Sequence, residues 1–157
     1  MGLVLLSAVG LFATSPADAV TPVPANGALM PPSQFLPEKP GFTSWRTLGQ
    51  VELVKRDRKM VPAFAQVVTA LDGKPIKVQG FMMPLDIGDK QRRFLLVAAP
   101  PHCSFCLPAG PDAMIEVRAK SDVRYGFDAV ALSGTLQVLK DDPAGLYYRL
   151  VDAVPVP

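Results

Sequence analysis

Five short apolar segments with a two-residue period fill the second half of this 157-residue chain. Turn-forming residues separate them, for example at 86–90 and at 141–145. Alternation with this spacing is typical of the strands of a small sandwich or barrel, and not of alternating strand and helix units. The expected strands are Pro75–Leu85, Arg93–Ala99, Met114–Ala119, Ala129–Leu139 and Leu146–Val156.

Glycines inside two of these segments favour a barrel. Gly80 and Gly134 each lie within an otherwise apolar strand, where glycine marks a bulge or a tight bend. Apolar residues make up 49% of the chain, which is enough for one core. We therefore expect a mainly β protein with an N-terminal helix, built as a small five-stranded OB-like barrel, with a small β-sandwich as the alternative.

Helical spacing of apolar residues precedes the strands. Residues 45–54 have apolar positions three apart, which predicts a short helix. A firmer helix is expected over 61–71, with Pro62 in its first turn and Gly73 just past its end. The basic run between them, residues 55–59, is expected to be a solvated helix face.

The N-terminal residues have the pattern of a secretory signal peptide over 1–19. An uncharged apolar run at 2–13 is too short to span a bilayer, and a small-x-small motif ends at Ala19. We expect cleavage after Ala19 and a periplasmic or secreted protein. Prolines then make residues 20–41 an extended leader, and residues 42–157 are expected to form a single β-rich domain.

The charge of the chain is small and scattered. The formal net charge is +2, and removal of Asp18 with the signal peptide raises it to +3. Together with export, this argues against a nucleic-acid partner. Contact with a membrane is expected only through a partner protein.

One cluster of residues carries the chemistry that the sequence offers. His102, Cys103 and Cys106 lie within five residues between flanking prolines, and they include both cysteines and the single histidine of the chain. Two thiolates and an imidazole suit Cu(I) or Zn(II). Further candidate ligands are Met82, Met83 and Asp112, although adjacent strand residues point to opposite faces, so at most one of the two methionines can face the loop.

Other interpretations of this cluster remain open. In an oxidising compartment, Cys103 and Cys106 would form a structural disulfide, and the protein would then be an interaction module whose cysteines only staple the loop. The C-x-x-C spacing is also that of thiol–disulfide oxidoreductases, but the motif lies between two strands and lacks the helix start that lowers a thiol pKa. Covalent haem attachment requires His directly after the second Cys, where this chain has Leu107. A single histidine also excludes a Ser-His-Asp triad separate from the cysteine loop.

The segment Gly80–Leu85 (GFMMPL), with Phe94–Val97 and the cysteine loop before Met114–Val117, resembles a bacterial family of domains of unknown function, number 3299. The resemblance covers roughly residues 42–152 and implies a small exported protein, in some members associated with envelope ABC-type transport systems for metals. Many members have Cys followed by His, whereas here His102 precedes Cys103. The resemblance implies no reaction, so we expect a non-enzymatic accessory protein that handles Cu or Zn with an envelope transporter or another periplasmic protein.

Overall fold

The computed structural model of the chain describes residues 36–100 and 110–157. The expected signal peptide and most of the expected leader lie outside the described residues. The elements in chain order are α1 (Trp45–Leu48), β1 (Val51–Arg56), β2 (Lys59–Phe64), α2 (Gln66–Thr69), β3 (Pro75–Pro84), β4 (Lys90–Val97), the 3-10 helix η3 (Pro111–Ala113), β5 (Met114–Arg124), β6 (Val130–Val138) and β7 (Tyr148–Pro155).

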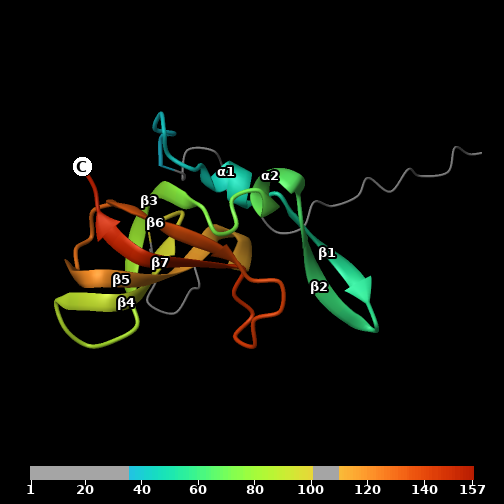
Figure 1. Cartoon of the computed structure of the whole chain (residues 1–157). Helices are drawn as coiled ribbons and strands as arrows, with labels where there is room; N and C mark the ends of the chain where they lie inside the picture. Colours follow the sequence, from blue (N-terminus) through green and yellow to red (C-terminus); the bar gives the residue numbers. More distant parts are fainter. Residues whose placement is uncertain (1–35, 101–109) are drawn as a thin grey trace, which may run out of the picture.

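Strands β3 to β7 form a closed barrel (Figure 1). Their order around it is β3–β4–β5–β7–β6, and β6 pairs back with β3. The pair β5–β7 is parallel, and every other pair in the barrel is antiparallel. A parallel contact between the third and fifth strands of a closed five-stranded barrel is the OB-like arrangement. The predicted barrel is therefore confirmed, and the sandwich alternative is wrong.

Each of the five expected segments forms one barrel strand, but two strands are longer than expected. β4 begins at Lys90, and β5 continues to Arg124. Beyond the apolar run the two strands still pair, with Gln91 opposite Val123 and Lys90 opposite Arg124. Pairing thus extends past the apolar run, because backbone hydrogen bonds and not side-chain polarity define the ladder.

The core lies inside the barrel and follows the two-residue period of the strands. Inward residues alternate with outward ones because successive strand side chains point to opposite faces. The Trp45 side chain of α1 extends this core, and its indole Nε1 donates to the Gln79 carbonyl oxygen at 2.8 Å. The largest fully buried core residues include Phe94, Leu96, Ile115, Leu132, Leu136, Tyr148 and Leu150.

The two mid-strand glycines are needed because neighbouring strands approach closely. A Cβ atom at Gly80 would lie 2.8 Å from the Val97 carbonyl oxygen and 2.8 Å from Cγ of Leu96. At Gly134 it would lie 2.8 Å from the Val151 carbonyl oxygen, beside a register irregularity in the β6–β7 pair. Both positions have the tight packing that strongly coiled barrel strands require.

The expected helices are wrong over most of their lengths. Only Trp45–Leu48 is helical in the first, and residues 51–56 form β1. In the second, residues 61–64 belong to β2 and only Gln66–Thr69 is helical. Both segments contain valines and pair with each other as a hairpin, which satisfies their backbone hydrogen-bonding groups and suits β-branched side chains.

In the part of the chain that the structure describes, no helix has the length and apolar character needed to cross a bilayer.

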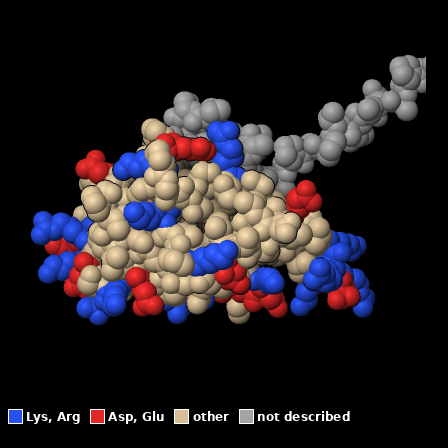
Figure 2. Space-filling model, turned by 45° about the horizontal axis from the view of Figure 1, so that its top comes forward, with Lys and Arg blue, Asp and Glu red and all other residues tan. Residues whose placement is uncertain are grey.

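The basic run 55–59 is the tip of the β1–β2 hairpin and not a helix face. Asp57 and Arg58 form its two-residue turn, and both have positive φ angles, 47° and 66°. Such a turn matches the right-handed twist of the strands. The hairpin projects from the barrel beside α2 (Figure 1), and Lys and Arg gather at its end in the space-filling view (Figure 2).

Candidate functional site

The connection that contains the cysteine cluster is anchored at both ends on the barrel. β4 ends and β5 begins at directly opposite residues, Val97 and Met114. One residue further into the connection on each side, the Ala98 N–H donates to the Ala113 carbonyl oxygen at 3.1 Å. Pro111 starts η3, where its missing N–H costs nothing. The two ends of the connection are thus held side by side at one end of the barrel.

Asp112 lies in η3, at the C-terminal end of this connection. It is 9% exposed, which is unusual for an aspartate. Among residues 36–100 and 110–157, no side chain or backbone group forms a hydrogen bond or an ion pair with its carboxylate. Burial raises the pKa of Tyr147 and Tyr148, and the charge of Asp112 raises both further. The negative charge of Asp112 therefore acts on both tyrosines.

Aromatic residues join this end of the barrel to the rest of the molecule. The Tyr148 hydroxyl donates to the Leu48 carbonyl oxygen at the end of α1. The ring of Phe64, at the end of β2, lies 5.6 Å from that of Tyr147 and 5.9 Å from that of Tyr148. The root of the hairpin, α1, η3 and the start of β7 consequently meet beside the anchored connection.

The predicted ligands have different placements. His102, Cys103 and Cys106 lie outside the described residues. Met82 is 3% exposed and belongs to the barrel core, so core packing accounts for it. Met83 is partly buried on the outer side of β3, opposite Leu95. In the described part of the chain, no three His, Cys, Asp or Glu side chains gather in a way that could hold a metal ion.

A buried ion-pair network on the outer side of the barrel was missed by the sequence interpretation. Glu116 of β5 is fully buried, and its two carboxylate oxygens accept from Arg93 Nε at 2.7 Å and Arg149 Nε at 2.5 Å. Arg118 Nη2 lies 3.5 Å from Oε1. Arg149 also contacts the Asp142 carboxylate at 3.4 Å. Residues from β4, β5 and β7 thus share one carboxylate.

The arginines keep Glu116 ionised despite its burial. Burial by itself raises the pKa of a carboxyl group. Here hydrogen bonds from Arg93 and Arg149, and the charges of Arg149 and Arg118, outweigh burial, so the pKa of Glu116 lies below its ordinary value. The hydrogen bond to Glu116 in turn raises the pKa of Arg93. In the sequence, the signal for this ion-pair network was a glutamate between Ile115 and Val117 in an otherwise apolar strand.

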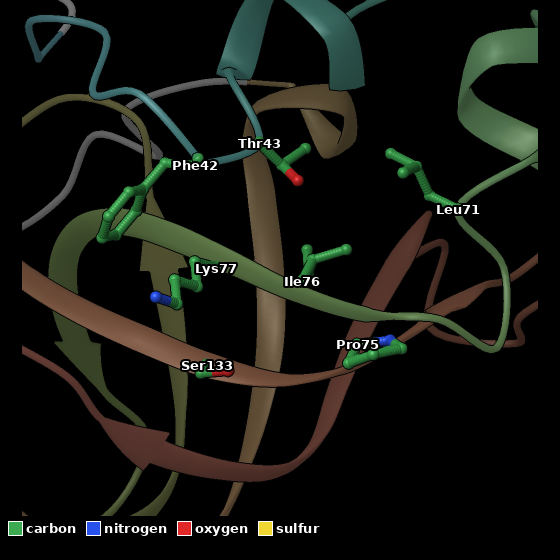
Figure 3. Close-up of a pocket in the computed structure, with 8 residues that line it drawn as sticks. Phe42, Thr43, Leu71, Pro75, Ile76, Lys77 and Ser133 are labelled. Atoms are coloured by element: carbon green, nitrogen blue, oxygen red, sulfur yellow. The ribbon is translucent and has the colours of Figure 1, made fainter.

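A separate open pocket of about 420 Å³ lies on the other side of the barrel (Figure 3). The segment before α1 forms one wall, and the Thr43 N–H donates to the Lys77 carbonyl oxygen at 2.7 Å. Among the described residues that line it, Lys77 is the one titratable side chain. It is lined by Gly41, Phe42, Thr43, Leu71, Pro75, Ile76, Lys77 and Ser133.

Comparisons with known proteins identify the family of the chain. Among curated proteins, none matches this chain. A crystal structure of a DUF3299 family protein from Pseudomonas aeruginosa PAO1 is similar, with 22% identity, a TM-score of 0.49, and coverage of 61% of this chain and 68% of that one. Residues 28–149 match the sequence model of DUF3299, a protein of unknown function. The chain therefore belongs to the DUF3299 family.

Proposed function

We propose that this chain is an exported, non-enzymatic accessory protein that binds Cu(I) or Zn(II) through His102, Cys103 and Cys106. These three side chains are the soft and borderline ligands that such metals prefer. A loop that holds them needs fixed ends, because ordering a free loop costs conformational entropy. The Ala98–Ala113 hydrogen bond and the paired ends of β4 and β5 provide these fixed ends.

The observation that carries the proposal is the anchoring of the connection at both ends on the barrel, through the Ala98–Ala113 hydrogen bond and the pairing of Val97 with Met114. Asp112 lies in η3 beside this anchor and is 9% exposed. A metal ion bound next to η3 would take Asp112 as its fourth ligand. An oxygen ligand beside two thiolates and an imidazole favours Zn(II), whereas a thioether from Met83 or Met114 would favour Cu(I).

Equilibrium dialysis of the reduced protein against Zn(II) or Cu(I) tests this proposal. We expect about one metal ion per chain, as in a closed four-ligand site. Cys103→Ser/Cys106→Ser should abolish uptake, and Asp112→Asn should weaken Zn(II) binding. Asp128→Asn, which changes an exposed aspartate, is the matched control and should leave binding unchanged. Equal metal uptake by the wild type and the double serine variant would contradict the proposal.

The oxidation state of the two thiols separates this proposal from a structural disulfide. Metal binding requires both sulfurs in the thiolate form. Titration of thiols in protein taken directly from the exported fraction should find both free. A bridged pair in that fraction would instead indicate that the cysteines only staple the connection.

We further propose export with cleavage after Ala19 and an envelope ABC-type transporter as partner. The support is the apolar run at 2–13 with its small-x-small motif, together with the family resemblance. N-terminal sequencing of the exported protein should begin at Val20. Retention of the full chain in the cell interior would contradict this part of the proposal.

A further inference from the structure

The outer face of β4 and β5 has a higher net positive charge than the whole chain. These two strands carry six Lys or Arg residues and two acidic ones, a net charge of +4, whereas the full chain has +2. All six cationic side chains are exposed. They are Lys90, Arg92, Arg93, Arg118, Lys120 and Arg124.

Like charges lie directly opposite each other across these strands. Arg93 pairs with Arg118, and Lys90 pairs with Arg124. Directly opposed like charges destabilise a sheet. Glu116 partly compensates the first pair, but in the described part of the chain no ion pair involves Lys90 or Arg124. The second pair thus retains its repulsion, which an external anion would relieve.

Glu116 also holds Arg93 in a geometry that leaves donors for a ligand. The carboxylate takes the Nε donor of Arg93, while the side chain remains 60% exposed. A guanidinium has four further N–H donors on its two terminal nitrogens. Arg118 is 54% exposed and lies only at the edge of hydrogen-bond distance from Glu116. The two exposed guanidinium groups can therefore bind one anionic group between them.

We propose that the β4–β5 face binds a linear acidic polysaccharide. β4 and β5 are the second and third strands of the OB-like barrel, and this face binds oligosaccharides and oligonucleotides in such barrels. The two cationic pairs are three residues apart along β4 and six along β5, and they are separated by the register irregularity between Gln91 and Arg93. One carboxylate of the polymer binds at Arg93 and Arg118, and another binds at Lys90 and Arg124. Expected export favours a polysaccharide over a nucleic acid.

Anisotropy of fluorescently labelled polygalacturonate, titrated with the full chain at low salt, tests the proposal. We expect two double variants, Arg93→Gln/Arg118→Gln and Lys90→Gln/Arg124→Gln, each to weaken binding about tenfold. This loss corresponds to about 1.4 kcal/mol of binding free energy. The second variant leaves the Glu116 network intact, so it separates binding from folding. Arg56→Gln/Lys59→Gln removes the like-charged pair at the hairpin tip and is the matched control. It should change the affinity less than about twofold.

Three outcomes would overturn the proposal. The first is no binding of polygalacturonate by the wild type. The second is an equal loss of affinity in the hairpin variant and the two barrel variants, which would indicate a general charge effect. The third is tighter binding of duplex DNA or of phosphatidylglycerol vesicles than of polygalacturonate, which would assign the face to another polyanion.

Discussion

The β1–β2 hairpin and the β4–β5 ribbon are both basic antiparallel pairs, but their surroundings differ. The hairpin projects from the barrel, and its Leu53 and Met60 are 43% and 59% exposed. The β4–β5 ribbon lies within a closed barrel, with the core on one side and the charged face on the other. A buried acid, Glu116, organises the arginines of the barrel ribbon. The hairpin charges lie at an exposed tip.

This difference shows that positive charge alone does not define a binding face. At the hairpin tip, four cationic residues surround Asp57 in solvent, where each ion pair contributes little. On the barrel, strand pairing fixes the backbone positions from which the cationic side chains project, and the buried Glu116 carboxylate restrains Arg93. A fixed array loses less entropy on binding a ligand than a set of free side chains does.

The first test compares two leucines, one in each ribbon. Leu96 of β4 is fully buried, whereas Leu53 of β1 is 43% exposed. Leu96→Ala should lower the free energy of unfolding by about 3 to 4 kcal/mol, because it leaves a cavity in the barrel core. Leu53→Ala should lower it by less than about 1 kcal/mol. Urea unfolding followed by circular dichroism measures both, and similar losses would mean that the hairpin is as well packed as the barrel.

The second test compares two glutamates. Glu116→Gln removes the carboxylate that three arginines share and should cost about 2 kcal/mol. This is below the roughly 3 to 5 kcal/mol of a fully buried pair, because Arg93 and Arg118 are more than half exposed. Glu52→Gln, at an exposed position of β1, should change stability by less than about 0.5 kcal/mol. An unaffected urea midpoint in Glu116→Gln would show that the network contributes no net stability.

The same pair of variants gives a pH dependence with a definite sign. The pKa of Glu116 is lower in the folded protein than its ordinary value of 4.5. Its stabilising contribution is therefore fully present above about pH 4.5 and is lost as the pH falls through the folded-state pKa. The stability difference between wild type and Glu116→Gln should shrink as the pH is lowered from 5 towards 3, by up to about 2 kcal/mol. A difference that stays constant over this range would contradict an ionised Glu116.

The barrel was predictable from sequence because its signal is local to each strand. Alternating apolar residues in segments such as residues 75–85 indicate a strand with one buried face, and turn-forming residues indicate where each strand ends. Gly80 and Gly134 indicated bent strands without showing which backbone comes close. The hairpin was missed because Phe64 also fits a helical stripe with Val67, Val68 and Leu71, and only the partner strand shows that residues 61–64 are extended.

The charged face was not predictable, because strand pairing creates it. Arg93 and Arg118 are 25 positions apart in the chain and become neighbours only through the β4–β5 register. The run 55–59 is visible as a cluster in the sequence, yet its charges lie at an exposed tip. The cysteine cluster was found directly, since its members are adjacent in sequence. The buried state of Asp112 required the fold.

The smallest effect expected is a gain of stability at the hairpin tip. Arg58 has a φ angle of 66°, a region that glycine adopts readily and that costs other residues roughly 1 kcal/mol. Arg58→Gly should therefore raise the free energy of unfolding of the hairpin by up to about 1 kcal/mol. Because the hairpin lies outside the barrel, amide hydrogen exchange of β1 and β2 is the proper measurement, with the barrel amides as internal control. Faster exchange in β1 and β2 would mean that the Arg58 side chain itself stabilises the turn, and that the tip is more organised than its exposure indicates.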